Sequence, residues 1–168
     1  MTTTPIKYTV KLTVNGKPYS AEVPTYRTLV DFLRYDLGLT GTKETCSIGV
    51  CGACTITLDG KMAASCILLA VRADGADIQT IEGVANGDEL HPVQEAFIAN
   101  GGFQCGACTP GQIMASKALL EEIPHPTEAE IKEWMMGNLC RCTGYYQIID
   151  SIKAAAETMG KAAAGTKG

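Results

Sequence analysis

Eight cysteines in two groups of four constrain this chain more than any other feature of its sequence. The groups are Cys46, Cys51, Cys54 and Cys66, then Cys105, Cys108, Cys140 and Cys142. The first residues, MTTTPIKYTVKL, show neither a twin-arginine motif nor a hydrophobic export segment, so we expect a cytoplasmic protein. Because thiols stay reduced in that compartment, metal or cluster ligation is favoured over disulfides, redox thiols and buried small side chains.

Composition and charge exclude several classes of protein. Hydrophobic residues make up 46% of the 168 residues and charged residues 19%, so the chain can bury a core. Lys and Arg total 14 against 18 Asp and Glu, which gives a formal net charge of −4, and basic residues do not cluster. We therefore expect no nucleic-acid partner. No apolar run approaches the roughly 20 residues of a membrane helix, so no membrane partner is expected either.

The first half of the chain has the pattern of a small β-rich domain. IKYTVKLTV alternates apolar and polar residues, and Asn15-Gly16 is a hairpin signal before a second strand in KPYSAEV. Thr28 and Asp31 match a capping box for a helix that Gly38 can end. A second hairpin turning at Asp59-Gly60 and a strand in ADIQTI complete the pattern. Two hairpins around one helix resemble a β-grasp arrangement.

Beyond residue 90 the signals become helical. The segment EGVANGDELHP lacks apolar periodicity, so we place a linker at residues 83–90 between domains 1–82 and 91–168. Helices are predicted in PVQEAFIAN, from Thr109 to about Glu122, from Thr127 to about Gly137, and from about Tyr145 to Met159. Thr109 and Gln112 are predicted to cap the second of these. Four helices suggest an all-α four-helix bundle, and the fold class is then α+β.

The first cysteine group has the spacing C-x4-C-x2-C followed by a distant cysteine, which is typical of plant-type [2Fe–2S] ligation. Gly49 and Gly52 allow sharp turns and a close approach of backbone N–H groups to sulfur. Such donors stabilise an anionic cluster and favour its reduced state. A zinc knuckle is the alternative, but zinc sites usually combine two short C-x2–4-C hooks. The spacing therefore favours an iron–sulfur cluster.

The second cysteine group consists of two hooks, C-x2-C and C-x-C. The first hook directly precedes the helix predicted from Thr109, and the second precedes Thr143, which can cap the last helix. Both helix starts would then direct free N–H groups and positive dipole ends at an anionic cluster. We interpret the group as a second [2Fe–2S] site. Zinc, or a thioredoxin-like redox pair at Cys105 and Cys108, are the alternatives.

Three segments together resemble the small iron–sulfur subunit of the molybdenum hydroxylases, the xanthine dehydrogenase family. They are CSIGVCGACTITLDG…SC, QCGACTPGQIMAS and GNLCRCTGYYQIIDSI. The resemblance covers residues 6 to about 158. It implies a plant-type ferredoxin-like β-grasp domain and a helical domain, each with one [2Fe–2S] cluster. It also implies a large partner subunit with molybdopterin-bound molybdenum and a medium one with FAD, assembled as a dimer of heterotrimers.

The resemblance further implies roles for individual residues. The cluster of the second cysteine group is proximal to molybdenum, and the cluster of the first group is distal, toward the flavin. Gln104 and Cys142 match positions that contact or adjoin the pterin. Ala107 stands where the family often has an aromatic residue, and Thr45 where it often has glycine. Neither is a ligand, but Ala107 is expected to leave the proximal cluster more exposed than usual.

Electron transfer is the function that these features predict. Electrons would leave a substrate at molybdenum in another chain and pass singly through the proximal and then the distal cluster to FAD or another acceptor. No Ser–His–Asp set, phosphate loop or carboxylate pair stands out in the sequence. We therefore expect an oxidoreductase subunit with no catalytic residue of its own. The alternatives are a stand-alone ferredoxin-type carrier and a zinc-stabilised interaction module.

Overall fold

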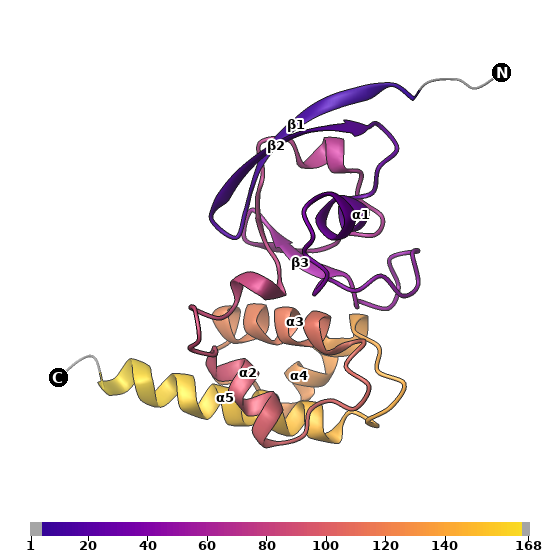
Figure 1. Cartoon of the computed structure of the whole chain (residues 1–168). Coiled ribbons are helices and arrows are strands. Elements are labelled where there is room, and N and C mark those ends of the chain that lie inside the picture. Colours follow the sequence, from indigo (N-terminus) through magenta and orange to yellow (C-terminus); the bar gives the residue numbers. More distant parts are fainter. Residues whose placement is uncertain (1–4, 166–168) are drawn as a thin grey trace.

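A half built on a β-sheet and a helical half lie one above the other in the computed structural model (Figure 1). The structure describes residues 5–165, with side chains up to residue 160. Residues 1–4 and 166–168, which the predicted domains include, lie outside the described residues.

The described part of the first half contains a mixed five-stranded sheet. Two antiparallel hairpins, β1 (Lys7–Val14) with β2 (Lys17–Pro24) and β3 (Thr55–Leu58) with β4 (Lys61–Ala64), supply four strands. The fifth, β5 (Asp77–Gln79), lies between the hairpins, parallel to β1 and antiparallel to β3. The strand order is β2-β1-β5-β3-β4.

Local sequence explains the turns of this sheet. Asn15-Gly16 and Asp59-Gly60 all have positive φ, which two-residue hairpin turns require and which these residue types tolerate. The predicted helix begins as α1 (Leu29–Asp31), where the Thr28 side chain accepts the Asp31 N–H. It continues as a π-helical turn, η1 (Phe32–Asp36). Large apolar side chains from these elements form the core: Val10, Leu29, Phe32, Leu33, Ile56 and Ile78.

The described part of the second half contains four α-helices. They are α2 (Pro92–Ala99), α3 (Thr109–Glu122), α4 (Glu128–Trp134) and α5 (Tyr146–Gly165), with a 3-10 turn, η4 (Met135–Gly137), after α4. Their apolar faces enclose a second core: Phe97, Met114, Leu119, Ile131, Ile148 and Ile152. None of the described helices combines the length and apolarity needed to cross a lipid bilayer.

The prediction of an all-α four-helix bundle is wrong. Helices α2 to α5 have 8, 14, 7 and 20 residues, so they lack the matched lengths from which such a bundle is built. Loops 100–108 and 138–145 interrupt the helices and carry the second cysteine group. Moreover, α3 packs against β3 and β4 of the first half as well as against its helical neighbours. The observed fold is a small sheet-containing unit followed by an irregular helical unit.

Helix α3 lies at the boundary between the halves and packs against the sheet half (Figure 1). Its start differs from prediction: Cys108 occupies the N-cap position, and Thr109 is already helical. Gln112 does not reach back to the helix start; its Nε2 donates to the backbone oxygen of Asn138 at 2.8 Å. A tertiary partner has replaced the predicted local capping contact, which ties α3 to the loop that follows η4.

Candidate iron–sulfur sites

The first cysteine group lies at the edge of the sheet half that faces α3. Residues 46–54 form a loop leading into β3, and Cys66 follows β4. Cys54 and Cys66 are buried, with 1% and 5% of their surfaces exposed, and they pack against Val30. Cys46 and Cys51 are half-buried. The group therefore has one sheltered pair and one pair nearer the surface.

The loop backbone turns its N–H groups toward the sulfurs. Ser47, Gly49 and Gly52 have φ of 56°, 76° and 69°, the left-handed region in which glycine is favoured. With this backbone, the N–H groups of Ile48 and Val50 donate to the Cys46 thiol. Inward-directed donors of this kind suit an anionic group held by thiolates.

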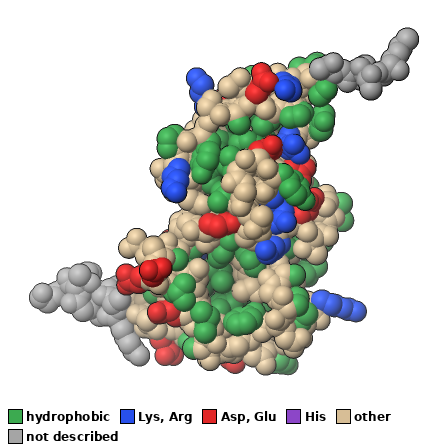
Figure 2. Space-filling view, viewed as in Figure 1, with side chains coloured by type: hydrophobic (Ala, Val, Ile, Leu, Met, Phe, Trp, Pro, Cys, Tyr) green, Lys and Arg blue, Asp and Glu red, His purple; other side chains and the backbone are tan. Residues whose placement is uncertain are grey.

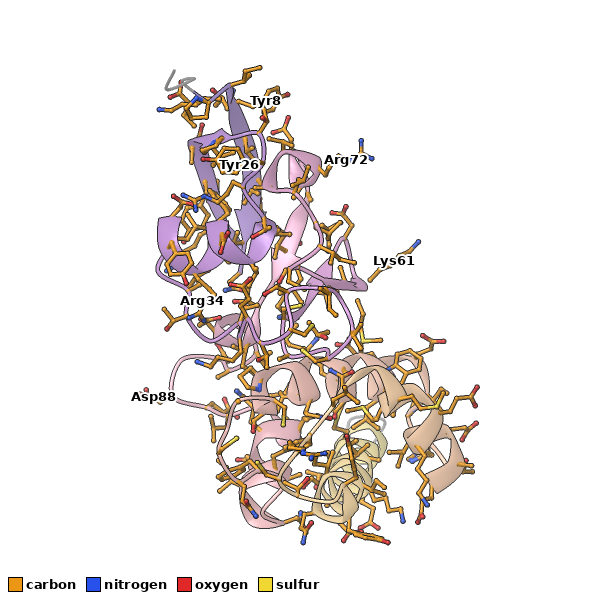
Figure 3. All side chains as sticks on the ribbon, turned by 90° about the vertical axis from the view of Figure 1, so that its right-hand side faces the viewer. Tyr8, Tyr26, Arg34, Lys61, Arg72 and Asp88 are labelled. Atoms are coloured by element: carbon orange, nitrogen blue, oxygen red, sulfur yellow. The ribbon has the colours of Figure 1, made fainter. Side chains whose placement is uncertain are left out.

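Arg34 holds the segment that leads into this loop. Its guanidinium Nη1 donates to the backbone oxygens of Thr40 and Thr42, both at 2.8 Å. Figure 3 places Arg34 in the lower part of the sheet half, whereas Tyr8 lies at its far end.

The thiols of the first group form two hydrogen-bonded pairs, Cys46 with Cys51 and Cys54 with Cys66. The backbone N–H of Ile48 is the main group that lowers the pKa of Cys46, to about 6. Burial raises the pKa of Cys51, and burial together with the Cys54 thiol raises that of Cys66 to about 12. The surface pair thus has one thiol that ionises readily, which favours metal binding because the thiolate is the ligand form.

The second cysteine group joins two loops of the helical half. Cys105 and Cys142 are exposed, and their Sγ atoms lie 3.5 Å apart. Cys108 and Cys140 are half-buried and hydrogen-bonded to each other. Each pair thus takes one cysteine from each hook, and the two hooks face one another.

Thr143 and Tyr145 surround Cys140 with hydrogen bonds. The backbone N–H and the hydroxyl of Thr143 lie 3.4 and 3.1 Å from the Cys140 Sγ, and the Cys140 N–H donates to the Tyr145 hydroxyl at 2.9 Å. Tyr145 has φ of 73°, a strained conformation for a residue other than glycine. Burial favours a raised pKa at Cys140, but the Thr143 hydroxyl and the N–H of Cys142 outweigh it and lower the pKa.

The ionisation of the other thiols follows the same pairwise pattern. The N–H of Ala107 lowers the pKa of Cys105, whereas the hydrogen bond with Cys105 raises that of Cys142. Burial raises the pKa of Cys108 to about 12. Each pair of the second group therefore contains one thiol that ionises more readily than its partner.

A cavity of about 120 Å³ separates the two groups and is shared by them. All four cysteines of the second group line it, and so does Cys51 of the first. Thr45, Ala107 and Leu139 contribute further walls. The two cysteine groups are thus neighbours across one small space, with Cys51 the member of the first group that faces the second.

The pairwise arrangement fits a two-iron cluster better than a single metal ion. Within the described part of the chain, no three Cys, His, Asp or Glu side chains converge closely enough to hold one ion. A structural zinc ion needs four ligands around one point. A [2Fe–2S] cluster instead takes four thiolates, two at each iron. The zinc interpretation is the poorer fit for both groups.

Gln104 and His91 lie outside the two ligand groups. Gln104 is exposed and directly precedes Cys105, on the surface that also carries Cys142. His91 caps α2, with its Nδ1 accepting the Val93 N–H at 3.2 Å.

Sequence reasoning missed the hydrogen bonds that Asn138, Thr143 and Tyr145 make around the second hook. The sequence held one usable signal for these residues, which is their position directly beside the ligand spacing of that hook.

Fold and sites together define a two-domain iron–sulfur protein. A family model for a "2Fe-2S iron-sulfur cluster binding domain" matches residues 12–80, and one for a "[2Fe-2S] binding domain" matches residues 80–153. The chain thus contains two [2Fe–2S]-binding domains, a ferredoxin-like one and a helical one.

Similar proteins show to which family of iron–sulfur proteins the chain belongs. A probable xanthine dehydrogenase subunit of Bacillus subtilis is 53% identical over 84% of this chain and 81% of its own length. The iron–sulfur-binding subunit of an Escherichia coli aldehyde oxidoreductase is 48% identical over 86% of this chain and 70% of its own. A chain of quinoline 2-oxidoreductase from Pseudomonas putida superimposes with a TM-score of 0.89 at 44% identity, over 92% of this chain and 97% of that one. The chain belongs to the small iron–sulfur subunits of the xanthine dehydrogenase family of molybdenum hydroxylases, whose role is electron transfer within an oxidoreductase complex.

Proposed function

We propose that each cysteine group holds one [2Fe–2S] cluster. The ligands of the distal cluster are Cys46, Cys51, Cys54 and Cys66, and those of the proximal cluster are Cys105, Cys108, Cys140 and Cys142. When bound, such clusters accept and release one electron at a time. The observation that carries the proposal is the division of each group into two thiol pairs.

The surrounding residues supply charge stabilisation at both sites. Backbone N–H groups donate to Cys46 and Cys105, and the Thr143 hydroxyl donates to Cys140. Hydrogen bonds to charged acceptors are worth roughly 1.5–3 kcal/mol each. Because these donors come from fixed loops, they favour the added negative charge of the reduced state without rearrangement.

We further propose that the second cysteine group faces a large subunit with molybdopterin-bound molybdenum, and that Gln104 and Cys142 lie nearest the pterin. The exposure of Cys105, Cys142 and Gln104 on one surface supports this assignment. The relatives named above are called after xanthine, aldehyde and quinoline. Such variety supports placing the substrate site in another chain.

The surface around both groups supports permanent partners over a stand-alone carrier. Large apolar side chains are exposed beside the first group, at Ile48, Val50 and Ile67, and beside the second, at Phe103 and Leu139. Apolar patches of this kind mark protein–protein contacts. Basic side chains are scattered on the face seen in Figure 2. The proposed complex adds a medium FAD subunit and forms a cytoplasmic dimer of heterotrimers.

Elemental analysis of the natively purified protein tests the proposal. We expect about four irons with matching acid-labile sulfide per chain, two for each [2Fe–2S] cluster, and molybdenum and flavin in larger co-purifying chains. Cys46→Ser should remove one of two EPR signals and Cys142→Ser the other. The boundaries 1–82 and 91–168 should emerge as protease-resistant fragments. Zinc without iron, or a monomeric iron protein on gel filtration, would favour the interaction module or the free carrier.

A further inference from the structure

A buried asparagine joins the two cysteine loops. Asn138, 6% exposed, stands two residues before Cys140, and its Nδ2 donates across the boundary to the backbone oxygen of Gly52 at 3.1 Å. The same Nδ2 lies 3.4 Å from the hydroxyl of Thr55. Gly52 directly follows Cys51, so one side chain of the second loop is hydrogen-bonded to the backbone of the first.

The backbone of Asn138 is held in turn by a side chain of α3. Gln112, fully buried in the first turns of α3, donates from Nε2 to the backbone oxygen of Asn138 at 2.8 Å. Thr55 donates its hydroxyl to the same Gly52 oxygen at 2.7 Å. Because the Asn138 Nδ2 is engaged by two oxygens, the amide has a preferred orientation, and turning it would leave this buried donor without an acceptor.

The backbones at this point are as close as packing allows. A Cβ on Gly111 of α3 would lie 2.1 Å from the Gly52 oxygen, and a Cβ on Gly52 would lie 2.3 Å from the Gly137 oxygen. Both distances are below van der Waals contact. The spacing of the two loops is therefore set by glycine-to-backbone contact, by the Asn138 amide and by the neighbouring backbone hydrogen bond from the Leu139 N–H to the Cys51 oxygen.

We propose that Asn138 is a positioning residue that fixes the separation and relative orientation of the two clusters. It touches neither set of thiols; it acts through Gly52 on the loop of Cys51 and through its own backbone on the loop of Cys140. The inference rests on the proposed function, in which both cysteine groups hold clusters. Its effect concerns the geometry between the clusters and not their loading.

EPR spectroscopy of the fully reduced, cluster-loaded full-length chain tests this role. The magnetic splitting between two paramagnetic clusters falls with the cube of their separation and depends on their orientation. We expect Asn138→Ala to retain its iron and both EPR signals but to lose part of the splitting. Gly111→Ala should also change the splitting, because its Cβ would displace Gly52 from α3 without removing a hydrogen bond of Asn138.

Asn100→Ala is the matched control, since Asn100 also donates a side-chain hydrogen bond, to the backbone oxygen of Ala96 within its own unit. It should keep the wild-type splitting. Unchanged splitting in a fully loaded Asn138→Ala protein would overturn the proposal. Failure of both Asn138→Ala and Gly111→Ala to take up iron would also overturn it, because the contact between Asn138 and Gly52 would then be needed for iron uptake. Absence of two [2Fe–2S] signals in the wild-type chain would instead refute the proposed function.

Discussion

The backbone N–H of Leu139 donates to the backbone oxygen of Cys51 at 2.9 Å. Leu139 directly precedes Cys140, so this single hydrogen bond joins a cysteine of the first group to the neighbour of a cysteine of the second. The connection from the Cys51 Sγ to the Cys140 Sγ runs through covalent bonds except at this hydrogen bond.

Leu139→Pro should slow electron exchange between the clusters. Proline removes the N–H that makes this contact, and the preceding residue, Asn138, already has extended backbone angles (φ −121°, ψ 94°), outside the α region that is disfavoured before proline. We also expect a loss of about 1 kcal/mol in the free energy of unfolding. Rapid-reduction kinetics should show slower filling of the second cluster. Leu139→Ala keeps the N–H, and an equal slowing in that variant would contradict the role of the bond.

Gly52→Ala should impair iron binding at the first group more than Gly106→Ala impairs it at the second. Both glycines have positive φ, 69° and 81°, so each substitution costs roughly 1–2 kcal/mol of backbone strain. At Gly52 the added Cβ also collides with the Gly137 oxygen, whereas at Gly106 it meets no described atom within 4 Å. Iron per chain measures the difference. Equal iron loss in both variants would show that backbone strain alone matters.

Local signals explain which parts of these sites the sequence predicts. The C-x4-C-x2-C spacing and its glycines indicate the first loop because ligands and turn residues lie within nine positions of each other. The signals for the range of α3 and for the start of the helix predicted from Thr127 are likewise local, and the structure confirms both. The contact between Asn138 and Gly52 joins residues far apart in sequence, and no local pattern encodes it.

The failure of the bundle prediction has a related cause. Apolar periodicity shows where helices lie but not how the loops between them are held. Here the cysteine loops and the contact of α3 with β3 and β4 decide the packing. Gln112 illustrates the same limit, because its sequence position suggests a helix cap while the fold offers it the oxygen of Asn138.

Thr143→Val should lower the reduction potential of the proximal cluster. Valine has the shape of threonine but lacks the hydroxyl that lies 3.1 Å from the Cys140 Sγ. Losing a donor to sulfur disfavours the more negative, reduced state. A fall of about 60 mV would change one-electron occupancy tenfold. Redox titration followed by EPR measures it, and Thr143→Ser should keep the wild-type value. An unchanged potential in Thr143→Val would rule out this tuning.

Ala107→Phe should also shift the potential of the proximal cluster. Ala107 is exposed and lines the cavity beside the second group, and its backbone N–H donates to Cys105. A phenyl ring there would exclude water without altering that N–H. Ala107→Ser leaves the site open and serves as the control. If both variants titrate like the wild type, solvent at position 107 has no influence on the cluster.

Glu128→Gln should weaken the junction of α4 and α5 in a pH-dependent way. Hydrogen bonds from Lys132 and then Lys153 lower the pKa of Glu128 from 4.5 to about 2. The stabilisation by this carboxylate is therefore full above about pH 4.5 and is lost as the pH falls toward 2. Thermal unfolding in a fixed cluster state should give the variant a lower Tm than the wild type at pH 7 and the same Tm at pH 2. A pH-independent difference would argue against the ion pairs.

The unequal burial of the two cysteine groups has a consequence for how the protein is assembled in the cell. Cys54 and Cys66 are enclosed behind Val30, whereas Cys105 and Cys142 lie open on the surface. An iron–sulfur donor could reach the open pair on an already folded chain, but the enclosed pair has almost no exposed surface that a donor could reach. Maturation should then be ordered, with the enclosed site filled while the chain is still folding and the open site available until a partner subunit covers it.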